Sequence, residues 1–420
     1  MKKFFISLFV VILSLNVVTA FAQEGTSVKR NNEYIVYSGR WMNNAAGMHS
    51  GWQATCKISF TGTLLKISGK GNVFIQIDDK EPVDFTLLDD TVVAQGLAEV
   101  EHTAIIMPQK FNDKMTIKNF TLDKGASVIP CKWVPTVECI GDSLSSGGFE
   151  NEKGSPFLVK LGYPYFLGKK LGWNVYSVAQ SGIPLCENER TGEGRAMSIM
   201  YDYWSMHSSD AVNKDKAIEK HPDYIILKLG ANDWYQYVSK EKWIQTNIEF
   251  ITHLREKHPN AVIFVVSPFT FARVEDTKTA VEHFDSDKVV FVDPTNWGYQ
   301  QYRISDNCHF GKEGNIFIAD KFYDVIMNYV STHSMPTATA TVAPTTAPTE
   351  KPTEKATAQA TAQATDKPSQ QNTPTATQQA QNQEGDFNAL PFIAGGAAVC
   401  AAGGAAAVII KKKKDKKDKK

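Results

Sequence analysis

The sequence predicts an antiparallel β-sandwich or jelly-roll domain over residues 28–127, followed by a three-layer, flavodoxin-like α/β domain over residues 134–331. The first domain is indicated by short alternating apolar runs between turn signals, with no long helical period. The second is indicated by compact runs of branched residues that alternate with amphipathic helical segments. A length of 420 residues with 42% hydrophobic content is enough for more than one core.

Several strand-like runs define the predicted β-domain. They cover residues 64–67, 73–77, 92–93, 104–107 and 115–122. Trp41 and Trp52 are expected in the core, because large aromatic side chains usually supply buried area first. A domain of this kind can bind glycan or support a neighbouring domain.

Five branched apolar runs define the predicted parallel sheet of the second domain. They cover residues 137–140, 175–178, 224–229, 262–266 and 289–292. Helices are expected over 241–257 and, closing the domain, over 312–329. Their apolar stripes are expected at Ile244, Ile248, Ile251 and Leu254 in the first, and at Ile316, Phe317, Phe322 and Ile326 in the second.

The N-terminus has the composition of a secretory signal peptide, predicted over residues 1–22. Lys2 and Lys3 precede an apolar run, and residues 20–22 read Ala-Phe-Ala, which fits a small-x-small cleavage site. The mature chain is therefore expected to begin at Gln23. A retained N-terminal anchor is the alternative.

The C-terminal part predicts a membrane tether. Residues 335–386 are rich in Thr, Pro, Ala and Gln, and hold too few apolar side chains to fold, so a disordered linker is expected. Residues 389–410 are uncharged and long enough to span a bilayer. The basic tail 411–420 is then expected in the cytoplasm, with the folded domains anchored at the outer cell surface. A soluble low-complexity tail is the alternative.

The formal net charge of zero hides an asymmetry. The last ten residues hold eight lysines and two aspartates, and Lys2 and Lys3 add two cations, which leaves residues 23–410 at −8. An acidic chain argues against a nucleic-acid partner, whose binding needs clustered basic side chains. Neutral carbohydrate is compatible with this charge.

Five cysteines fall in the folded part, so at least one is expected to be an unpaired thiol. They are Cys56, Cys131, Cys139, Cys186 and Cys308. Cys308 lies beside a histidine, but no second Cys/His cluster has metal-ligand spacing, so a packing role is expected. No metal or organic cofactor is expected.

Four short motifs follow one another along the second domain. They are Gly141-Asp142-Ser143-Leu144, Ser181-Gly182, Gly230-Ala231-Asn232-Asp233 and Asp306-Asn307-Cys308-His309. Each one alone is explained as a turn or a helix cap. Three of them follow predicted strands, and the fourth precedes the closing helix, so they are expected at one rim of the sheet, where α/β folds place their sites.

Together the motifs supply the groups that acyl transfer needs. His309 can take the proton of the Ser143 hydroxyl while its oxygen attacks an ester carbonyl. Asp306 can accept the other ring N–H, fix the tautomer and offset the imidazolium charge. The backbone N–H groups of Ser143 and Gly182 and the Asn232 amide can stabilise the resulting oxyanion.

The four motifs resemble the conserved blocks of the SGNH (GDSL-type) hydrolase superfamily over about residues 134–331. The segment before them carries Gly39-Arg40-Trp41 and Phe60-Thr61-Gly62-Thr63, and is similar to the jelly-roll domain of carbohydrate esterase family 2. That resemblance implies removal of acetyl groups from plant-type polysaccharide. Phe310 stands where proline is frequent, and some members use a Ser-His dyad, so the resemblance does not require Asp306.

Aromatic residues gather around the predicted site. They are Tyr201, Tyr203, Trp204, Trp234, Tyr235, Tyr237, Trp297 and Tyr299. Flat aromatic faces stack on sugar rings, so substrate binding is expected from Trp234, Tyr235 and Trp297, with core packing as the alternative for each. Trp234 is the strongest candidate because it lies two residues past Asn232.

Three functions fit these observations. The leading one is an extracellular serine esterase that removes O-acetyl groups from a xylan- or mannan-type polysaccharide through an acetyl-enzyme. The second is the same chemistry on lipid or cell-envelope glycan esters. The third is a non-catalytic surface protein whose β-domain binds carbohydrate.

Overall fold

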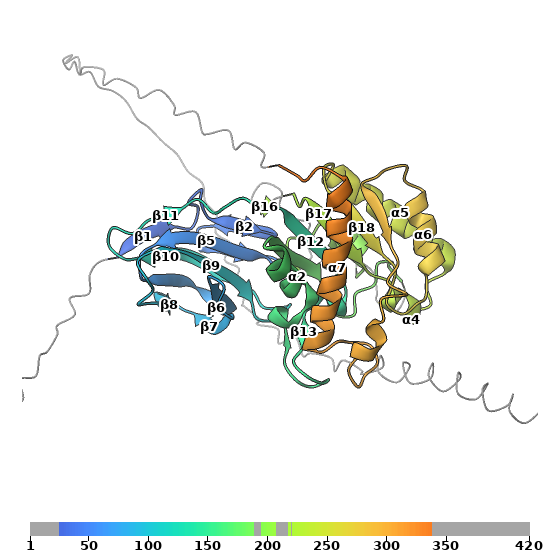
Figure 1. Cartoon of the computed structure of the whole chain (residues 1–420), viewed down its shortest axis with the longest axis horizontal. Coiled ribbons are helices and arrows are strands. Elements are labelled where there is room, and N and C mark those ends of the chain that lie inside the picture. The colour runs from blue at the N-terminus through green and yellow to red at the C-terminus, as the bar shows by residue number, and fades with distance from the viewer. Residues whose placement is uncertain (1–24, 189–194, 207–216, 220, 338–420) are drawn as a thin grey trace, which may run out of the picture.

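The computed structural model describes residues 25–188, 195–206, 217–219 and 221–337, which form a β-domain and an α/β domain (Figure 1). The fold class predicted from the sequence is confirmed, since an antiparallel sheet precedes a parallel one. The predicted signal peptide, membrane span and basic tail lie outside the described residues, as does the linker beyond residue 337.

Within the described residues, the β-domain is built from eleven consecutive strands in antiparallel pairs. They are β1 (Thr26–Lys29), β2 (Val36–Ser38), β3 (Arg40–Asn44), β4 (Gly47–Ser50), β5 (Thr55–Thr61), β6 (Leu65–Ile77), β7 (Val83–Leu87), β8 (Thr91–Ala94), β9 (Glu101–Pro108), β10 (Thr116–Leu122) and β11 (Val128–Ile129). Strands from both halves of the sheet contribute to one apolar core that includes Trp41, Phe60 and Phe120.

Strand β6 connects the two halves of this domain. The sequence predicts two strands over residues 64–67 and 73–77, but they are one strand of 13 residues. Its first half, up to Lys70, pairs with β10 and β8, and its second half, from Gly71, pairs with β7 and β9. Gly71 has φ +123°, and a Cβ there would lie 2.3 Å from the Lys114 carbonyl oxygen, so only glycine fits this change of partners.

The α/β domain has a five-stranded parallel sheet in the order β15-β12-β17-β18-β19. The strands are β12 (Thr136–Gly141), β15 (Asn174–Ala179), β17 (Tyr224–Lys228), β18 (Val262–Val266) and β19 (Val289–Val292), and all five were expected. In order of first appearance along the chain the sheet reads 2-1-3-4-5, which is the flavodoxin-like arrangement.

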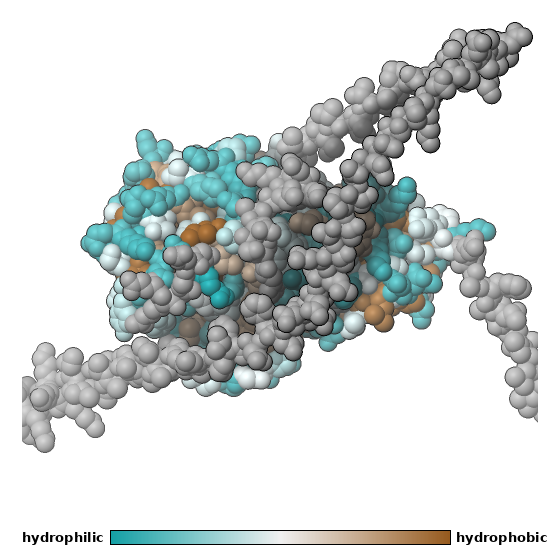
Figure 2. All heavy atoms as spheres, turned by 180° about the vertical axis from the view of Figure 1, so that it is seen from behind, coloured by the Kyte–Doolittle hydropathy of each residue, from teal (hydrophilic) through white to brown (hydrophobic). Residues whose placement is uncertain are grey.

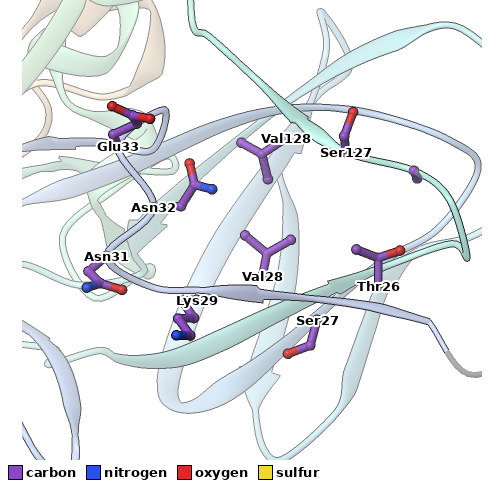
Figure 3. Close-up of a pocket in the computed structure, with 10 residues that line it drawn as sticks. Thr26, Ser27, Val28, Lys29, Asn31, Asn32, Glu33, Ser127 and Val128 are labelled. Carbon is purple, nitrogen blue, oxygen red and sulfur yellow. The ribbon is translucent and has the colours of Figure 1, made fainter. Parts of the chain in front are cut away.

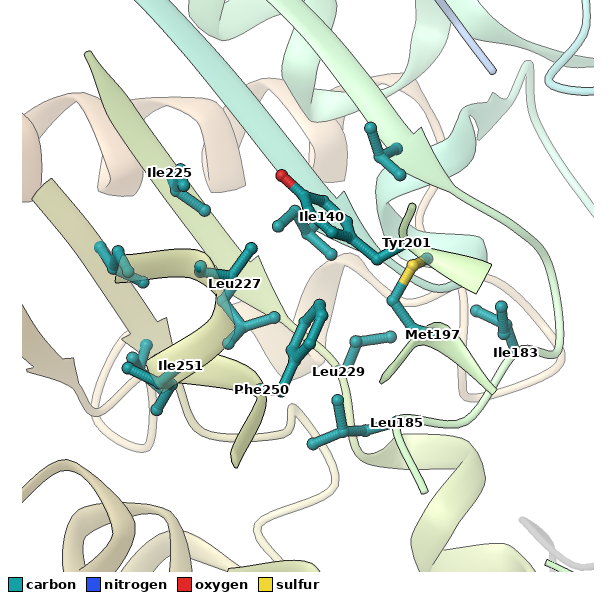
Figure 4. Close-up of a cluster of buried hydrophobic side chains, with 14 of the residues drawn as sticks. Ile140, Ile183, Leu185, Met197, Tyr201, Ile225, Leu227, Leu229, Phe250 and Ile251 are labelled. Carbon is teal, nitrogen blue, oxygen red and sulfur yellow. The ribbon is translucent and has the colours of Figure 1, made fainter. Parts of the chain in front are cut away.

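Helices cover both faces of this sheet. They are α1 (Ser143–Ser146), α2 (Tyr163–Leu171), α3 (Met197–Met200), α4 (Ala231–Tyr235), α5 (Lys240–Lys257), α6 (Val274–Glu282) and α7 (Lys312–Thr332). One face packs against α5 through Leu227, Phe250 and Ile251 (Figure 4). The opposite face packs against α2 and α7 through Leu167 and Phe322.

The two predicted helix stripes are only partly correct. In α5, Ile251 and Leu254 are buried, but Trp243 and Phe250 take the other core positions and leave Ile244 and Ile248 half-buried. In α7 the predicted Phe322 and Ile326 are buried, whereas Ile316 is 37% exposed. Asn315 takes the buried place beside it, because its side chain accepts the Tyr163 N–H at 3.1 Å and donates to the Gly311 carbonyl at 3.0 Å.

Buried polar contacts join the two domains. Arg40, from the β-domain, donates to the Tyr203 carbonyl at 3.0 Å, and its guanidinium lies 3.9 Å from the Glu138 carboxylate of the α/β domain. Arg40 and Glu138 are 2% and 1% exposed, so this ion pair is shielded from water. Strand β16 (Ala217–Glu219), which lies between β15 and β17 in the chain, pairs with β3 and extends the β-domain sheet.

The surface of the described chain is mixed in character. The face in Figure 2 is mainly hydrophilic, with scattered hydrophobic residues. A hollow of about 690 Å³ lies between β1 and residues 126–128 (Figure 3), and none of the candidate site residues lines it. Among the described helices, none has the length and apolar character needed to cross a bilayer. Among the described cysteines, Cys56, Cys131, Cys139 and Cys186 are free thiols.

Candidate active site

Three of the four motifs lie at the carboxyl ends of three neighbouring strands. Gly141 at the end of β12 is level with Ala179 of β15 and with Lys228 of β17. Ser143 follows two residues after Gly141, Gly182 three residues after Ala179, and Asn232 four residues after Lys228. The parallel register therefore brings these motifs to one edge of the sheet, at its topological switch point.

The candidate triad is assembled at this edge. His309 Nε2 lies 2.9 Å from Ser143 Oγ, and His309 Nδ1 lies 2.7 Å from Asp306 Oδ2. The His309 side chain is 22% exposed and the Asp306 side chain 5% exposed, so the imidazole is accessible while the carboxylate is covered. The structure thus places all three side chains in a single hydrogen-bonded chain.

The Asp306 carboxylate is held in its ionised form. Burial by itself raises the pKa of this carboxyl, but hydrogen bonds from the His309 ring and from the backbone N–H groups of His309 and Cys308 bring the pKa well below its ordinary value. An ionised carboxylate only accepts hydrogen bonds, so Nδ1 of His309 carries the proton. Nε2 is then free to accept the Ser143 hydroxyl proton.

A buried ion pair lies directly before the candidate nucleophile. Asp142 caps α1 by accepting the Leu144 N–H at 3.0 Å. The same oxygen, Oδ1, accepts a hydrogen bond from Lys228 Nζ at 2.7 Å, and the two side chains are 1% and 0% exposed. Lys228 Nζ also lies 5.3 Å from the centre of the Phe269 ring. This pair fixes the turn on which Ser143 sits.

Two of the three candidate oxyanion donors, the Gly182 N–H and the Asn232 amide, come from segments that are hydrogen-bonded to each other. Gly182 has φ +81° with open space where a Cβ would be, so glycine serves the backbone conformation and crowding plays no part. Asn232 Nδ2 donates to the Ile183 carbonyl at 3.0 Å, which orients the amide beside Gly182. An amide has two N–H donors, so one is left for a substrate oxyanion.

The Asp233 carboxylate binds the backbone of the segment that follows Gly182. Its two oxygens accept the backbone N–H groups of Leu185 at 2.9 Å and Cys186 at 2.8 Å. Burial raises the pKa of Asp233 to about 6, against the opposing effect of these hydrogen bonds. The carboxyl therefore titrates near pH 6, although it carries no expected catalytic role.

An aromatic contact supports the histidine. The Phe149 ring meets the His309 ring edge-on, with ring centres 5.5 Å apart. Phe157 packs against Phe149 at 4.8 Å, and Phe111 from the β-domain packs against Phe157 at 6.1 Å. A row of rings thus links the β-domain to the imidazole.

The predicted aromatic residues fall into two groups. Trp234 is 48% exposed and lies under the Arg273 guanidinium, 5.7 Å from it, while Tyr235 is half-buried. Trp297 belongs to a hydrophobic cluster and packs against Phe322 at 5.3 Å. Trp234 is therefore the residue of the three best placed to meet a ligand. Of the other aromatics, Tyr201 and Tyr299 are fully buried.

Sequence reasoning missed Lys228, Asp233 and Phe149 as parts of this site. A signal existed for Lys228, because a lysine inside a branched apolar strand needs a buried partner. Asp233 lies within a motif that was recognised, but its partners are backbone groups about 50 residues away. Phe149 gave no signal.

Two comparisons with known proteins bear on this geometry. Residues 139–315 match the model of the GDSL-like Lipase/Acylhydrolase family, and this range spans all four motifs. A comparison with curated proteins gave no match. The predicted resemblance of the α/β domain is thereby confirmed.

Solved structures of carbohydrate esterases share the two-domain fold. A family two carbohydrate esterase from Cellvibrio japonicus gives a TM-score of 0.60 at 18% identity, covering 73% of this chain and 98% of its own. The acetyl xylan esterase Est2A from Butyrivibrio proteoclasticus gives the same values. A family two carbohydrate esterase from Clostridium thermocellum, solved in complex with cellohexaose, gives 0.57 at 20%, with 71% and 99% covered.

Proposed function

Because residues 139–315 match the model of the GDSL-like Lipase/Acylhydrolase family, whose members hydrolyse carboxylic esters, we propose that the protein removes O-acetyl groups from a polysaccharide. The observation that carries this proposal is the hydrogen-bonded chain from Ser143 Oγ through His309 to Asp306. Such a chain generates a serine nucleophile at neutral pH.

In the proposed mechanism, Ser143 Oγ attacks the carbonyl carbon of the acetyl ester and His309 Nε2 takes the hydroxyl proton. The negative charge moves to the carbonyl oxygen, where the N–H groups of Ser143 and Gly182 and the Asn232 amide stabilise it. Loss of one such donor costs about 2.7–4 kcal/mol of transition-state stabilisation. The sugar alkoxide leaves with the proton from His309.

The acetyl group is then on Ser143, and water completes the cycle. His309 Nε2 removes a proton from a water molecule while that water attacks the acetyl-enzyme. The intermediate collapses to acetate, and the proton returns to Ser143 Oγ. Asp306 stabilises the imidazolium in both halves of the reaction because its carboxylate stays ionised.

A polysaccharide substrate is supported by architecture. Six solved esterase structures, four of them described as family two carbohydrate esterases, match this chain across 97–99% of their own length, so counterparts of both of their domains are present. Trp234 adds an exposed ring near Asn232, which suits stacking on a sugar. We propose a xylan- or mannan-type backbone as the substrate.

Acetate release from acetylated xylan, acetylated glucomannan and acetylated peptidoglycan tests this function. We expect wild-type protein to release acetate from xylan or glucomannan, and Ser143→Ala to release none. Ser331→Ala, at an exposed serine of α7, is the matched control and keeps full activity. Preference for long-chain nitrophenyl esters would instead indicate a lipid substrate, and no release from any ester would indicate a binding protein.

The proposed location is the outer cell surface, with residues 389–410 as the anchor and the tail 411–420 in the cytoplasm. It is supported by the apolar run and by the lysines that follow it. Full-length protein should remain in the membrane pellet after carbonate extraction, whereas a chain ending at residue 337 should be released. Recovery of the full-length chain in the supernatant would contradict the anchor.

A further inference from the structure

A groove of about 540 Å³ lies between the β-domain and the first part of the α/β domain, apart from the candidate triad. Its β-domain wall includes Thr55, Lys57 and Ser59, which alternate along β5 and so share one face. The residues that alternate with them, Cys56, Ile58 and Phe60, are fully buried in the β-domain core. The three polar side chains therefore point away from that core.

The facing wall belongs to α2 and to the start of β15. It presents Tyr165 and Trp173, both half-buried, together with the amide of Asn174. Trp173 is fixed in place because its ring stacks on Tyr224 with ring centres 5.3 Å apart. A ring that is already ordered loses little entropy when a ligand packs on it.

We propose that this groove binds a segment of a neutral polysaccharide and holds it away from the catalytic site. That the ligand is a polysaccharide rests on the proposed function. That it is uncharged and rich in hydroxyl groups rests on the side chains that line the groove. Hydroxyl and lysine groups on one wall face aromatic rings and the Asn174 amide on the other, and this combination recognises a sugar through its hydroxyls and its apolar ring faces.

Two of the charged side chains that line the groove, Asp78 and Lys169, already have protein partners. Asp78 accepts hydrogen bonds from the His102 ring and from the Thr103 N–H, each at 2.8 Å. Lys169 pairs with Glu81 at 2.7 Å. A charged ligand would have to compete with these contacts, whereas an uncharged polyol can use the remaining hydroxyl and amide groups.

Two long hydrogen bonds join the two walls of the groove. The Tyr165 hydroxyl donates to Gln76 Oε1 at 3.5 Å, and Lys57 Nζ donates to Asn174 Oδ1 at 3.5 Å. Both bonds are at the long limit for a hydrogen bond, so a sugar hydroxyl can replace either partner at low cost. The site is thus preformed but not closed by its own side chains.

The groove and the triad lie at opposite ends of the parallel sheet. Trp173 and Asn174 mark the start of β15, whereas Ser143 follows the end of β12. Six residues of strand span about 20 Å, so one sugar unit cannot occupy both places. The groove also borders Ser177 further along β15, towards the edge that carries Gly182. A long chain can therefore lie along β15 with one part in the groove while another part reaches Ser143.

Binding and activity of groove variants test this proposal. Thr55→Trp places a bulky ring in the groove, and Tyr165→Phe removes only the hydroxyl that contacts Gln76. Tyr34→Ala, an exposed β-domain tyrosine that does not line the groove, is the matched control. Each change is made in the full chain carrying Ser143→Ala, and affinity for deacetylated xylan and glucomannan is measured by affinity electrophoresis and calorimetry.

We expect Thr55→Trp to weaken polymer binding at least fivefold, Tyr165→Phe about twofold, and Tyr34→Ala not at all. In chains with Ser143 intact, the ratio of polymer to nitrophenyl acetate activity should fall about fivefold for Thr55→Trp, through KM. Polymer affinity and this ratio within twofold of wild type in the folded Thr55→Trp variant would overturn the groove. So would a preference for polygalacturonate over neutral polymer.

The outcomes also separate this inference from the proposed function. Polymer binding that Thr55→Trp abolishes, in a protein that releases no acetate, supports the groove and rejects the esterase. Acetate release that no groove variant alters supports the esterase and rejects the groove. Circular dichroism confirms folding of each variant, and if Thr55→Trp does not fold, the polymer affinity of Tyr165→Phe decides between these outcomes.

Discussion

Replacement of Lys228 by methionine tests the ion pair beneath the candidate nucleophile. Lys228 Nζ lies 2.7 Å from Asp142 Oδ1, and the two side chains are 0% and 1% exposed. The other carboxylate oxygen, Oδ2, has no hydrogen-bond partner within the described residues. Methionine fills a similar volume but removes the charge, so the Asp142 carboxylate would remain buried and uncompensated.

The expected cost is about 3–5 kcal/mol in the free energy of unfolding, because removing one partner of a buried pair leaves its charge unpaired. This is a large part of the roughly 5–15 kcal/mol that stabilises a typical protein. The double variant Lys228→Met, Asp142→Asn removes both charges, and asparagine still accepts the Leu144 N–H through its side-chain oxygen. We expect it to recover about half of the loss.

Urea unfolding of wild type, both single variants and the double variant measures this coupling. Lys118→Met is the matched control, because Lys118 pairs with Asp89 at 2.8 Å but the side chains are 48% and 73% exposed. We expect it to cost less than about 1 kcal/mol. A Lys228→Met variant as stable as Lys118→Met, or a double variant with additive losses, would refute the reasoning.

Three further predictions concern the candidate site. Asp306→Asn should lower kcat on nitrophenyl acetate about 10²–10⁴-fold with little change in KM, because the tautomer of His309 is no longer fixed; wild-type kcat would contradict a triad and favour a Ser-His dyad. The depressed pKa of Asp306 means that its contribution to stability is present above its ordinary pKa near 3.8 and is lost as pH falls through the lower folded value. The contribution of Asp233 to the free energy of unfolding depends on pH in the opposite direction, because its folded pKa of about 6 lies above its ordinary value of 3.8. Stability should therefore rise as pH falls from about 6 towards 4. Asp233→Asn should remove that part of the pH dependence measured by urea unfolding. An unchanged pH profile would show that Asp233 does not titrate there. Phe149→Ala should lower kcat about tenfold, because the His309 ring loses the aromatic ring that packs against it, whereas Phe149→Tyr keeps that ring and most of the activity. Equal kcat values for the two variants would show that Phe149 does not position His309.

Local sequence was sufficient for much of this site. Ser143, Gly182 and Asn232 each follow a run of branched residues, and parallel strands end at the same edge, so their approach was predictable without coordinates. The structure also brings His309 and Asp306 to Ser143 within hydrogen-bond distance. The catalytic roles of these residues remain predictions that the proposed variants test.

The features that could not be predicted from the sequence depend on contacts between residues far apart in the chain. In the sequence, Lys228 only interrupts an apolar strand, and its role is explained by the hydrogen bond to Asp142, which lies 86 residues earlier in the chain. Gly69 and Gly71 look like turn residues, yet β6 continues through them because it changes partners there. The apolar stripe of α5 was only partly right, because Trp243 and Phe250 are buried whereas Ile244 and Ile248 are half-buried. In each case tertiary packing overrides a local pattern.

The pairing of β16 with β3 has a consequence for how the protein melts. A strand from the middle of the α/β sequence completes a sheet of the other domain, and Arg40 is matched to Glu138 across the same boundary. Separation of the two domains would leave the β3 edge without its partner strand and would leave Arg40 and Glu138 without each other. Heating should therefore give a single calorimetric peak for both domains. Chimeras in which one domain is replaced by that of a distant relative should fold poorly unless β16, Arg40 and Glu138 are all retained.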